Sequence, residues 1–199
     1  MKRVPRQLAI DLKYRGRGGP RKGAGRPRKP GGRVSHDRRP SLSPHHPVHV
    51  TLRVAKDVAN LRRVQAFRRI EDAFQEGKDR FGFRVTHCSV QSNHLHLIAE
   101  AENRVSLARG MKGLEVRIAR GVNQALGRRG PLFAERYHAH VLKTPREVRN
   151  AVDYVLANWF RHAGREVGPY DLDRLSSVGN RSMVVPPQTW LLRVGWEAV

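Results

Sequence analysis

The sequence is poor in cysteine and in aromatic residues, and it has no long hydrophobic run. Its one cysteine, Cys88, cannot form an internal disulfide, which is compatible with a reducing cytoplasm. No apolar run approaches the roughly eighteen residues that a membrane-spanning helix requires, so we expect no membrane partner. The basic start, MKRVPRQLAI, lacks a following apolar stretch and is not predicted to be a secretory signal.

Acidic residues are also scarce, and this imbalance is the main clue to a partner. The 199 residues include 17 Asp or Glu against 39 Lys or Arg, which gives a formal net charge of +22. A field of this size favours a polyanionic partner, and nucleic acid is the first candidate. The 39% hydrophobic content is enough for one domain with a real core, plus extensions.

More than half of the net charge lies in the first fifth of the chain. Residues 1–40 contain fourteen Lys or Arg and two Asp. Residues 15–32 are rich in Gly, Pro and Arg without hydrophobic periodicity, so we expect residues 1–44 to form a disordered basic arm.

Within this arm, Gly25-Arg26-Pro27-Arg28-Lys29-Pro30 resembles an AT-hook, whose arginines enter the minor groove of A·T-rich duplex DNA. Ala24 stands where the first Arg of the usual core belongs. The alternative is a polybasic tail that neutralises phosphates without reading sequence. The expected DNA-binding residues are Arg21, Lys22, Arg26, Arg28 and Lys29.

Hydrophobic periodicity predicts an α+β fold of ferredoxin-like order, βαββαβ. Strands are expected over residues 48–54, 81–90, 93–100 and 136–142, with helices over 61–74 and 107–126 and a turn at Gln91-Ser92. The antiparallel sheet would carry these two helices on one face and leave the other face for ligands.

A further helix should follow the sheet. Thr144 is a predicted cap, Pro145 takes the first helical position and Glu147 stands three residues after the cap. An apolar stripe then leaves Tyr154 and Asn158 to one side, one turn apart. We expect a domain over residues 45–164 and a C-terminal extension over 165–199 whose closing apolar segment packs back on the domain.

The strand from Asn93 to Glu100 carries the most distinctive residues. His94 and His96 alternate with Leu95 and Leu97, so both imidazoles point to one face. Two neutral imidazoles close together can bind a divalent ion. The alternative is a polar strand face with two solvated histidines, because two ligands alone are too few for a metal site.

The segment Asn93-His94-Leu95-His96-Leu97-Ile98 resembles the His-hydrophobic-His motif of the single-tyrosine HUH transposases, which include the REP-associated tyrosine transposases. The segment from Tyr154 to Gly164 resembles the helix of that family that bears the nucleophile. Tyr154 and Asn158 match that motif, whereas Trp159 replaces its usual Pro.

The resemblance implies a metal-dependent enzyme that nicks and rejoins single-stranded or hairpin DNA through a 5′-phosphotyrosine link. Tyr154 would be the nucleophile, and His94, His96 and Asn158 would bind Mg²⁺ or Mn²⁺. A phenol whose pKa is near 10 is a poor nucleophile at neutral pH, so the metal or an unidentified base must assist it. A homodimer is compatible with the resemblance, as is a location at the bacterial nucleoid in the cytoplasm.

Several alternatives remain open at this stage. His138 and His140 form a second such pair on a predicted strand, and they could contribute to the metal site or simply face DNA or solvent. A structural zinc site at His45, His46 and His49 is not favoured, because the chain has a single cysteine. The protein could also be a non-catalytic DNA-binding protein derived from a transposase. An RNA-binding module ranks last, because the strand faces offer histidines instead of aromatic residues.

Overall fold

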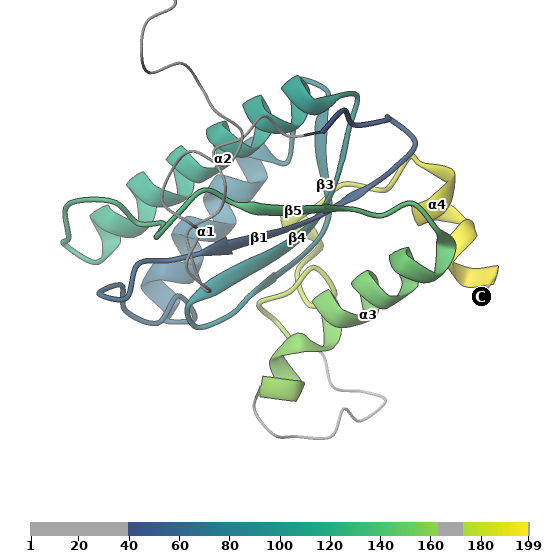
Figure 1. Cartoon of the computed structure of the whole chain (residues 1–199). Helices are drawn as coiled ribbons and strands as arrows, with labels where there is room; N and C mark the ends of the chain where they lie inside the picture. The colour runs from purple at the N-terminus through teal and green to yellow at the C-terminus, as the bar shows by residue number, and fades with distance from the viewer. Residues whose placement is uncertain (1–39, 163–172, 199) are drawn as a thin grey trace, which may run out of the picture. The chain divides into compact units, whose positions relative to one another are not determined.

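The computed structural model describes residues 40–162 and 173–198, and for residues 158–162 it describes the backbone only. The elements in chain order are β1 (Val48–Arg53), α1 (Val64–Gly77), β2 (Asp79–Arg80), β3 (Phe83–Val90), β4 (His94–Ala101), α2 (Arg104–Ala125), β5 (His138–Val141) and α3 (Pro145–His162). The 3₁₀ turn η1 (Arg181–Met183), the short helix α4 (Trp190–Arg193) and the turn η2 (Gly195–Ala198) follow (Figure 1). No helix in the described part of the chain is long and apolar enough to cross a membrane.

The five strands form one antiparallel sheet in the order β2-β3-β4-β1-β5. Apart from the two-residue β2, which the sequence did not predict, this is the expected ferredoxin-like α+β arrangement. Three residues, Gln91 to Asn93, join β3 to β4, and the N–H of Gln91 donates to the carbonyl of His94 at 2.9 Å. The predicted two-residue turn is therefore one residue longer.

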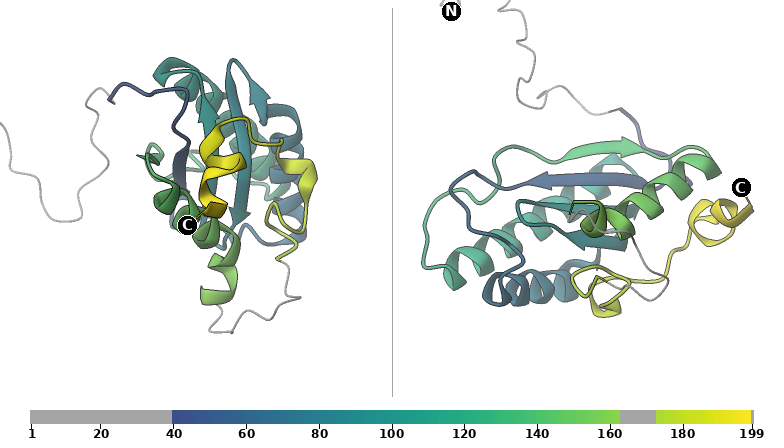
Figure 2. Two further views of the ribbon diagram at one scale, coloured as in Figure 1. Left: turned by 90° about the vertical axis from the view of Figure 1, so that its right-hand side faces the viewer. Right: turned by 90° about the horizontal axis from the view of Figure 1, so that it is seen from below.

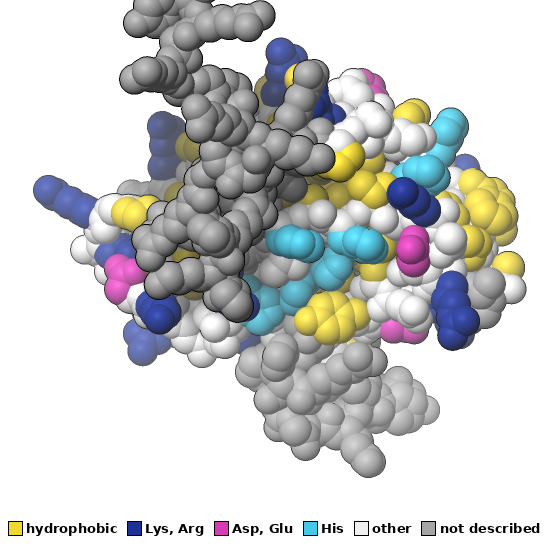
Figure 3. Space-filling view, in the orientation of Figure 1, with side chains coloured by type: hydrophobic (Ala, Val, Ile, Leu, Met, Phe, Trp, Pro, Cys, Tyr) yellow, Lys and Arg dark blue, Asp and Glu magenta, His cyan; other side chains and the backbone are white. Residues whose placement is uncertain are grey.

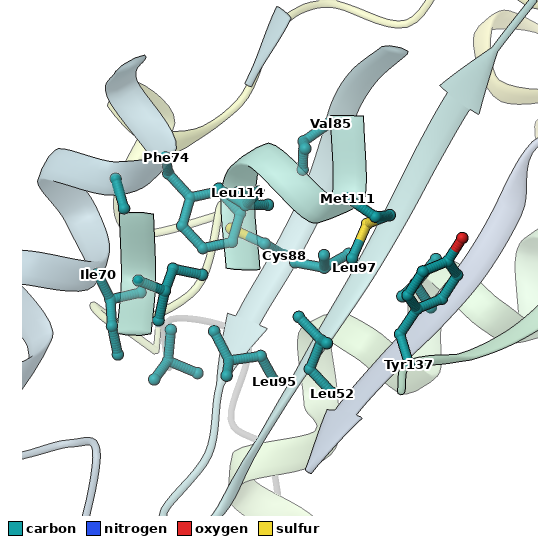
Figure 4. Close-up of a cluster of buried hydrophobic side chains, with 14 of the residues drawn as sticks. Leu52, Ile70, Phe74, Val85, Cys88, Leu95, Leu97, Met111, Leu114 and Tyr137 are labelled. Atoms are coloured by element: carbon teal, nitrogen blue, oxygen red, sulfur yellow. The ribbon is translucent and has the colours of Figure 1, made fainter. Parts of the chain in front are cut away.

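The main core lies between the sheet and helices α1 and α2 (Figure 4). Alternate residues of each long strand face this core, among them Leu95 and Leu97, and Tyr137 is buried there as expected. Val64 departs from the expected helical stripe, because it lies at the start of α1 and is 66% exposed. Leu61 is buried ahead of the helix instead.

The opposite face of the sheet carries α3 and the C-terminal segment (Figure 2). A second hydrophobic cluster forms there around Ile98, with Val148, Val152 and Val155 of α3 and Leu191 and Leu192 of α4. The start of α3 is capped as predicted. The N–H of Glu147 donates to Thr144 Oγ1 at 3.2 Å, and Glu147 Oε2 accepts from the N–H of Thr144 at 3.1 Å.

Buried charges attach the C-terminal segment to the domain. The carboxylate of Glu100 accepts from the backbone N–H of Gln188 and of Thr189, at 2.9 and 2.7 Å. Arg62 donates to the buried carboxylate of Asp173 at 2.7 Å. The expected packing of the closing segment on the domain is therefore observed.

Gly110 of α2 is required by its contact with the sheet. A Cβ there would overlap the ring of Phe83, a fully buried residue, whereas at Gly113 it would approach only the end of the long side chain of Arg117, at 3.2 Å. We expect Gly110→Ala to lower the free energy of unfolding by about 1–3 kcal/mol through overpacking. The matched Gly113→Ala should raise it by about 0.5–1 kcal/mol, since alanine favours helix. Urea denaturation of both variants measures this, and equal effects would contradict the packing.

Burial lowers the pKa of His87, on β3, from 6.5 to about 4. Between these values the unfolded chain binds more protons than the native state, so stability falls as the pH drops from 6.5 towards 4. We expect His87→Gln to reduce the loss of stability between pH 7 and pH 5 by about 1–2 kcal/mol relative to wild type. Denaturant titrations at the two pH values test this. An unchanged loss would show that His87 titrates normally.

Candidate functional site

The candidate site lies on the face of β4 that points away from α1 and α2. His94 and His96 occupy alternate positions, and their ring centroids are 4.7 Å apart with the planes nearly perpendicular, at 87°. His96 is only 4% exposed, whereas His94 is half-buried. Figure 3 shows histidine side chains gathered across the middle of this face. The sheet thus brings the two predicted residues together.

A neighbouring amide fixes the orientation of His94. Its Nδ1 lies 2.7 Å from Oδ1 of Asn93, and because an amide oxygen only accepts, Nδ1–H of His94 is the donor. The lone pair of the neutral ring is then on Nε2. This is the arrangement by which a second residue orients a metal-binding histidine.

His96 is held by two side chains of β1. In the antiparallel register Thr51 pairs with His96 and His49 pairs with Ile98. His49 Nε2 and Thr51 Oγ1 each lie 3.2 Å from His96 Nδ1. With Nδ1 occupied in this way, Nε2 is the atom through which His96 could bind a metal.

The pKa of His49 is lowered from 6.5 to about 4. Burial is the largest cause, and the charges of His140 and His138 on the neighbouring strand add to it. His49 is therefore neutral at physiological pH. A neutral ring can accept a hydrogen bond from His96, which a protonated ring could not do.

Tyr154 completes the cluster from the side of α3. Its half-buried ring meets the ring of His96 edge-on, with centroids 5.0 Å apart at 80°, and the ring of His49 at 5.9 Å and 69°. Val152 and Val155 flank it in the sequence and are buried against Ile98. The packing of α3 thus sets the position of the tyrosine over the histidines.

His138 and His140 lie on β5, where they pair with Thr51 and His49. Both are exposed, and they border the cluster on the side away from His94. His45 and His46 lie ahead of β1, and only His49 of that group joins the cluster.

The remaining predicted site residues lie outside the described part of the structure. Asn158 is on α3, one turn beyond Tyr154, but its side chain is not described. Arg21, Lys22, Arg26, Arg28 and Lys29 all belong to the first 39 residues, which are likewise outside it.

His49 is the site residue that sequence reasoning missed. Its place on the outer face of the first strand was readable from alternation with Val48 and Val50. Its contact with His96 depends on the register of β1 against β4, which a single sequence does not specify. A pattern of histidines on three strands of one predicted sheet was the available signal.

The donor set limits which metal site is possible. Among residues whose side chains are described, no three or more His, Cys, Asp or Glu are arranged to hold a metal ion. A cation bound by Nε2 of His94 and His96 would need a third donor of another kind. The carboxamide of Asn158 is such a donor, so the residues fit the implied metal in chemistry.

Comparison with known proteins concerns the fold and the family of the chain. A solved structure of a REP-associated tyrosine transposase bound to a REP hairpin matches the fold, with a TM-score of 0.57 and 15% sequence identity. The match covers 78% of this chain and 93% of that one. No protein with a curated description matches the sequence. Residues 44–158, more than half of the chain, match the family described as "Transposase IS200 like". The resemblance drawn from the two motifs is thereby confirmed, and the chain belongs to the IS200-like transposase family.

Proposed function

We propose that this transposase nicks and rejoins single-stranded or hairpin DNA through a covalent link to Tyr154. The observation that supports this most directly is the contact between the rings of Tyr154 and His96, 5.0 Å apart, beside His94. This contact would place the phenol next to a metal held by His94 and His96, where a phosphate polarised by that metal could be attacked. The candidate nucleophile and the candidate metal ligands belong to the same chain.

The chemistry assigned to Tyr154 is a displacement at phosphorus. Its phenol oxygen attacks the scissile phosphate and loses its proton, the bond from phosphorus to the 3′ oxygen breaks, and that oxygen leaves as a 3′-hydroxyl. The strand is then held as a 5′-phosphotyrosine. Because the phosphodiester energy is conserved in this link, a 3′-hydroxyl can later reverse the step and rejoin DNA.

Nε2 of His94 and of His96, with the carboxamide of Asn158, would hold Mg²⁺ or Mn²⁺. When bound, the cation neutralises charge on the phosphate oxygens and orients the phosphate for attack. His49 and Thr51 hold the Nδ1 side of His96, which keeps its Nε2 in place. Asn93 does the same for His94.

DNA is the partner that the charge of the chain and its family both favour. The transposase of similar fold was solved with a REP hairpin, and we assign a hairpin or single strand as the substrate class here. The basic arm would contact phosphates, with the AT-hook-like segment reaching A·T-rich duplex. Such substrates place its action at the nucleoid in the bacterial cytoplasm.

Tyr154→Phe tests the nucleophile. We expect it to reduce the yield of protein-DNA adduct by more than about 100-fold, since no oxygen remains to attack, while DNA affinity stays within about twofold. The assay uses 5′- and 3′-labelled oligonucleotides from the flanks of the gene, with Mn²⁺, and denaturing electrophoresis. The control is Tyr137→Phe in the main core, which should keep the adduct. Cleavage by Tyr154→Phe would refute the assignment. Binding without any adduct in wild type would favour a non-catalytic DNA-binding protein.

Metal affinity tests the histidines separately from catalysis. Calorimetric titration of the full chain with Mn²⁺ should show that His94→Ala abolishes binding. His49→Ala should weaken it by about 10–100-fold, the usual effect of losing a residue that orients a ligand. His140→Ala, exposed on β5, should leave it unchanged. If His140→Ala weakened Mn²⁺ binding as much as His94→Ala, the site would belong to the other histidine pair.

A further inference from the structure

The helix layer on the far side of the sheet has a groove that the proposed chemistry does not use. It lies between α1 and α2 and has a volume of about 890 Å³. Three of its lining residues, Ala73, Gly113 and Gly121, are small, and at Gly121 the two helices approach closely, because a Cβ there would lie 3.0 Å from Cβ of Arg69. The histidine cluster faces the other side of the sheet, so the groove is a separate surface.

The groove is lined by five cationic and two anionic side chains. Both carboxylates are already neutralised: Asp72 pairs with Arg69 and Glu76 with Arg117, each at 3.3 Å. The other cationic residues are Arg109, Lys112 and Arg120. All three are exposed, and none makes an ion pair within the described part of the chain.

These three residues form a line along α2. At about 100° per residue, Arg109, Lys112 and Arg120 fall within a stripe about 80° wide, and they span about 16 Å along the helix axis. A line of charges beside a groove complements the repeated phosphates of an extended strand better than a single compact anion.

Phe81 also lines the groove, and its backbone conformation is unfavourable for a bulky residue. It lies in the two-residue turn between β2 and β3, where Phe81 has φ 59° and Gly82 has φ 67°. Such turns favour Asn or Gly at the first position, because a bulky side chain is strained at positive φ. The ring is also 62% exposed, so it gains little from burial. Sites that bind single-stranded nucleic acid combine exposed aromatic residues, on which bases stack, with nearby cationic residues that contact phosphates. A strained and exposed aromatic residue beside these three cations fits that description.

We infer that the groove between α1 and α2 is a second DNA-binding surface, which holds a single strand with phosphates on Arg109, Lys112 and Arg120 and a base stacked on Phe81. This inference rests on the proposed function, because the proposed function identifies the polyanionic partner as DNA. The segment bound here is distinct from the scissile phosphate, because the sheet separates the two surfaces.

The first test measures the salt dependence of binding to a fluorescein-labelled single-stranded 15-mer by anisotropy. The full chain carries Tyr154→Phe and is kept free of metal, so cleavage does not interfere. Adding Arg109→Gln, Lys112→Gln and Arg120→Gln should reduce the slope of log K against log salt by about 2, since each lost phosphate contact contributes about 0.7. The control removes the same charge from the exposed Arg174, Arg181 and Arg193 and should change the slope by less than half as much. Equal reductions in the two variants would overturn the inference.

The second test uses Phe81→Asn, which places the preferred residue in the turn. Stability in urea should stay the same or rise, while affinity for the 15-mer falls about tenfold through lost stacking. Val64→Asn is the control, because Val64 is similarly exposed but outside the groove. Unchanged affinity in Phe81→Asn would contradict the stacking role.

The same measurements with the corresponding RNA test the nature of the strand. If the RNA bound more tightly than DNA, and the triple variant lost this binding, the surface would be assigned to RNA instead.

The two proposals fail in different ways. If the groove binds no DNA, the triple variant lowers the slope no more than the control variant does, while wild-type protein still forms the Tyr154 adduct. If the nucleophile is misassigned, the adduct is absent in wild type or persists in Tyr154→Phe, while the triple variant still lowers the salt slope more than the control variant does.

Discussion

The antiparallel pairing of β1 with β4 is the constraint on which the site depends. It sets Thr51 opposite His96 and puts the ring of His49 against the same nitrogen. The register is fixed from the other side of the sheet, where the alternate residues Val50 and Leu52 are fully buried. A slip by one residue would expose that core face and turn the histidine of β1 away from its partner. The buried face of β1 therefore fixes the positions of His49 and Thr51 relative to His96 on the opposite face.

The β4 strand serves two purposes along one face. Its first half presents His94 and His96, and its second half presents Ile98 and Glu100, which anchor α3 and the C-terminal segment. Because all four side chains project from one rigid strand, the tyrosine helix is positioned from the same element that carries the histidines. The C-terminal segment supports this helix, because Leu191 and Leu192 of α4 belong to the same buried cluster as Ile98 and α3.

Sequence patterns predicted most of this fold because the period of the apolar residues and the capping residues depend only on neighbours along the chain. Periodicity located the strands and helices, and the Thr144 and Glu147 cap marked the start of α3 to the residue. The patterns failed where burial depends on how elements pack together. Val64 fits the apolar stripe of a helix, yet it is exposed because it precedes the part of α1 that packs on the core. The pairing of Arg62 with Asp173 joins residues 111 positions apart, and the contact of His49 with His96 joins residues 47 apart. No short-range rule encodes such separations.

The described part of the chain has two hydrophobic clusters of unequal size, with no buried residue in common. The larger unites the sheet with α1 and α2 through twenty-six buried residues, whereas eight hold α3 and α4. Local opening requires the least free energy where the fewest apolar contacts are lost. Separating α3 and α4 from the sheet therefore exposes fewer buried apolar residues than separating α1 and α2 from it. We therefore expect α3, which would carry the attached strand, to open at a lower cost in free energy than the sheet that displays the histidines.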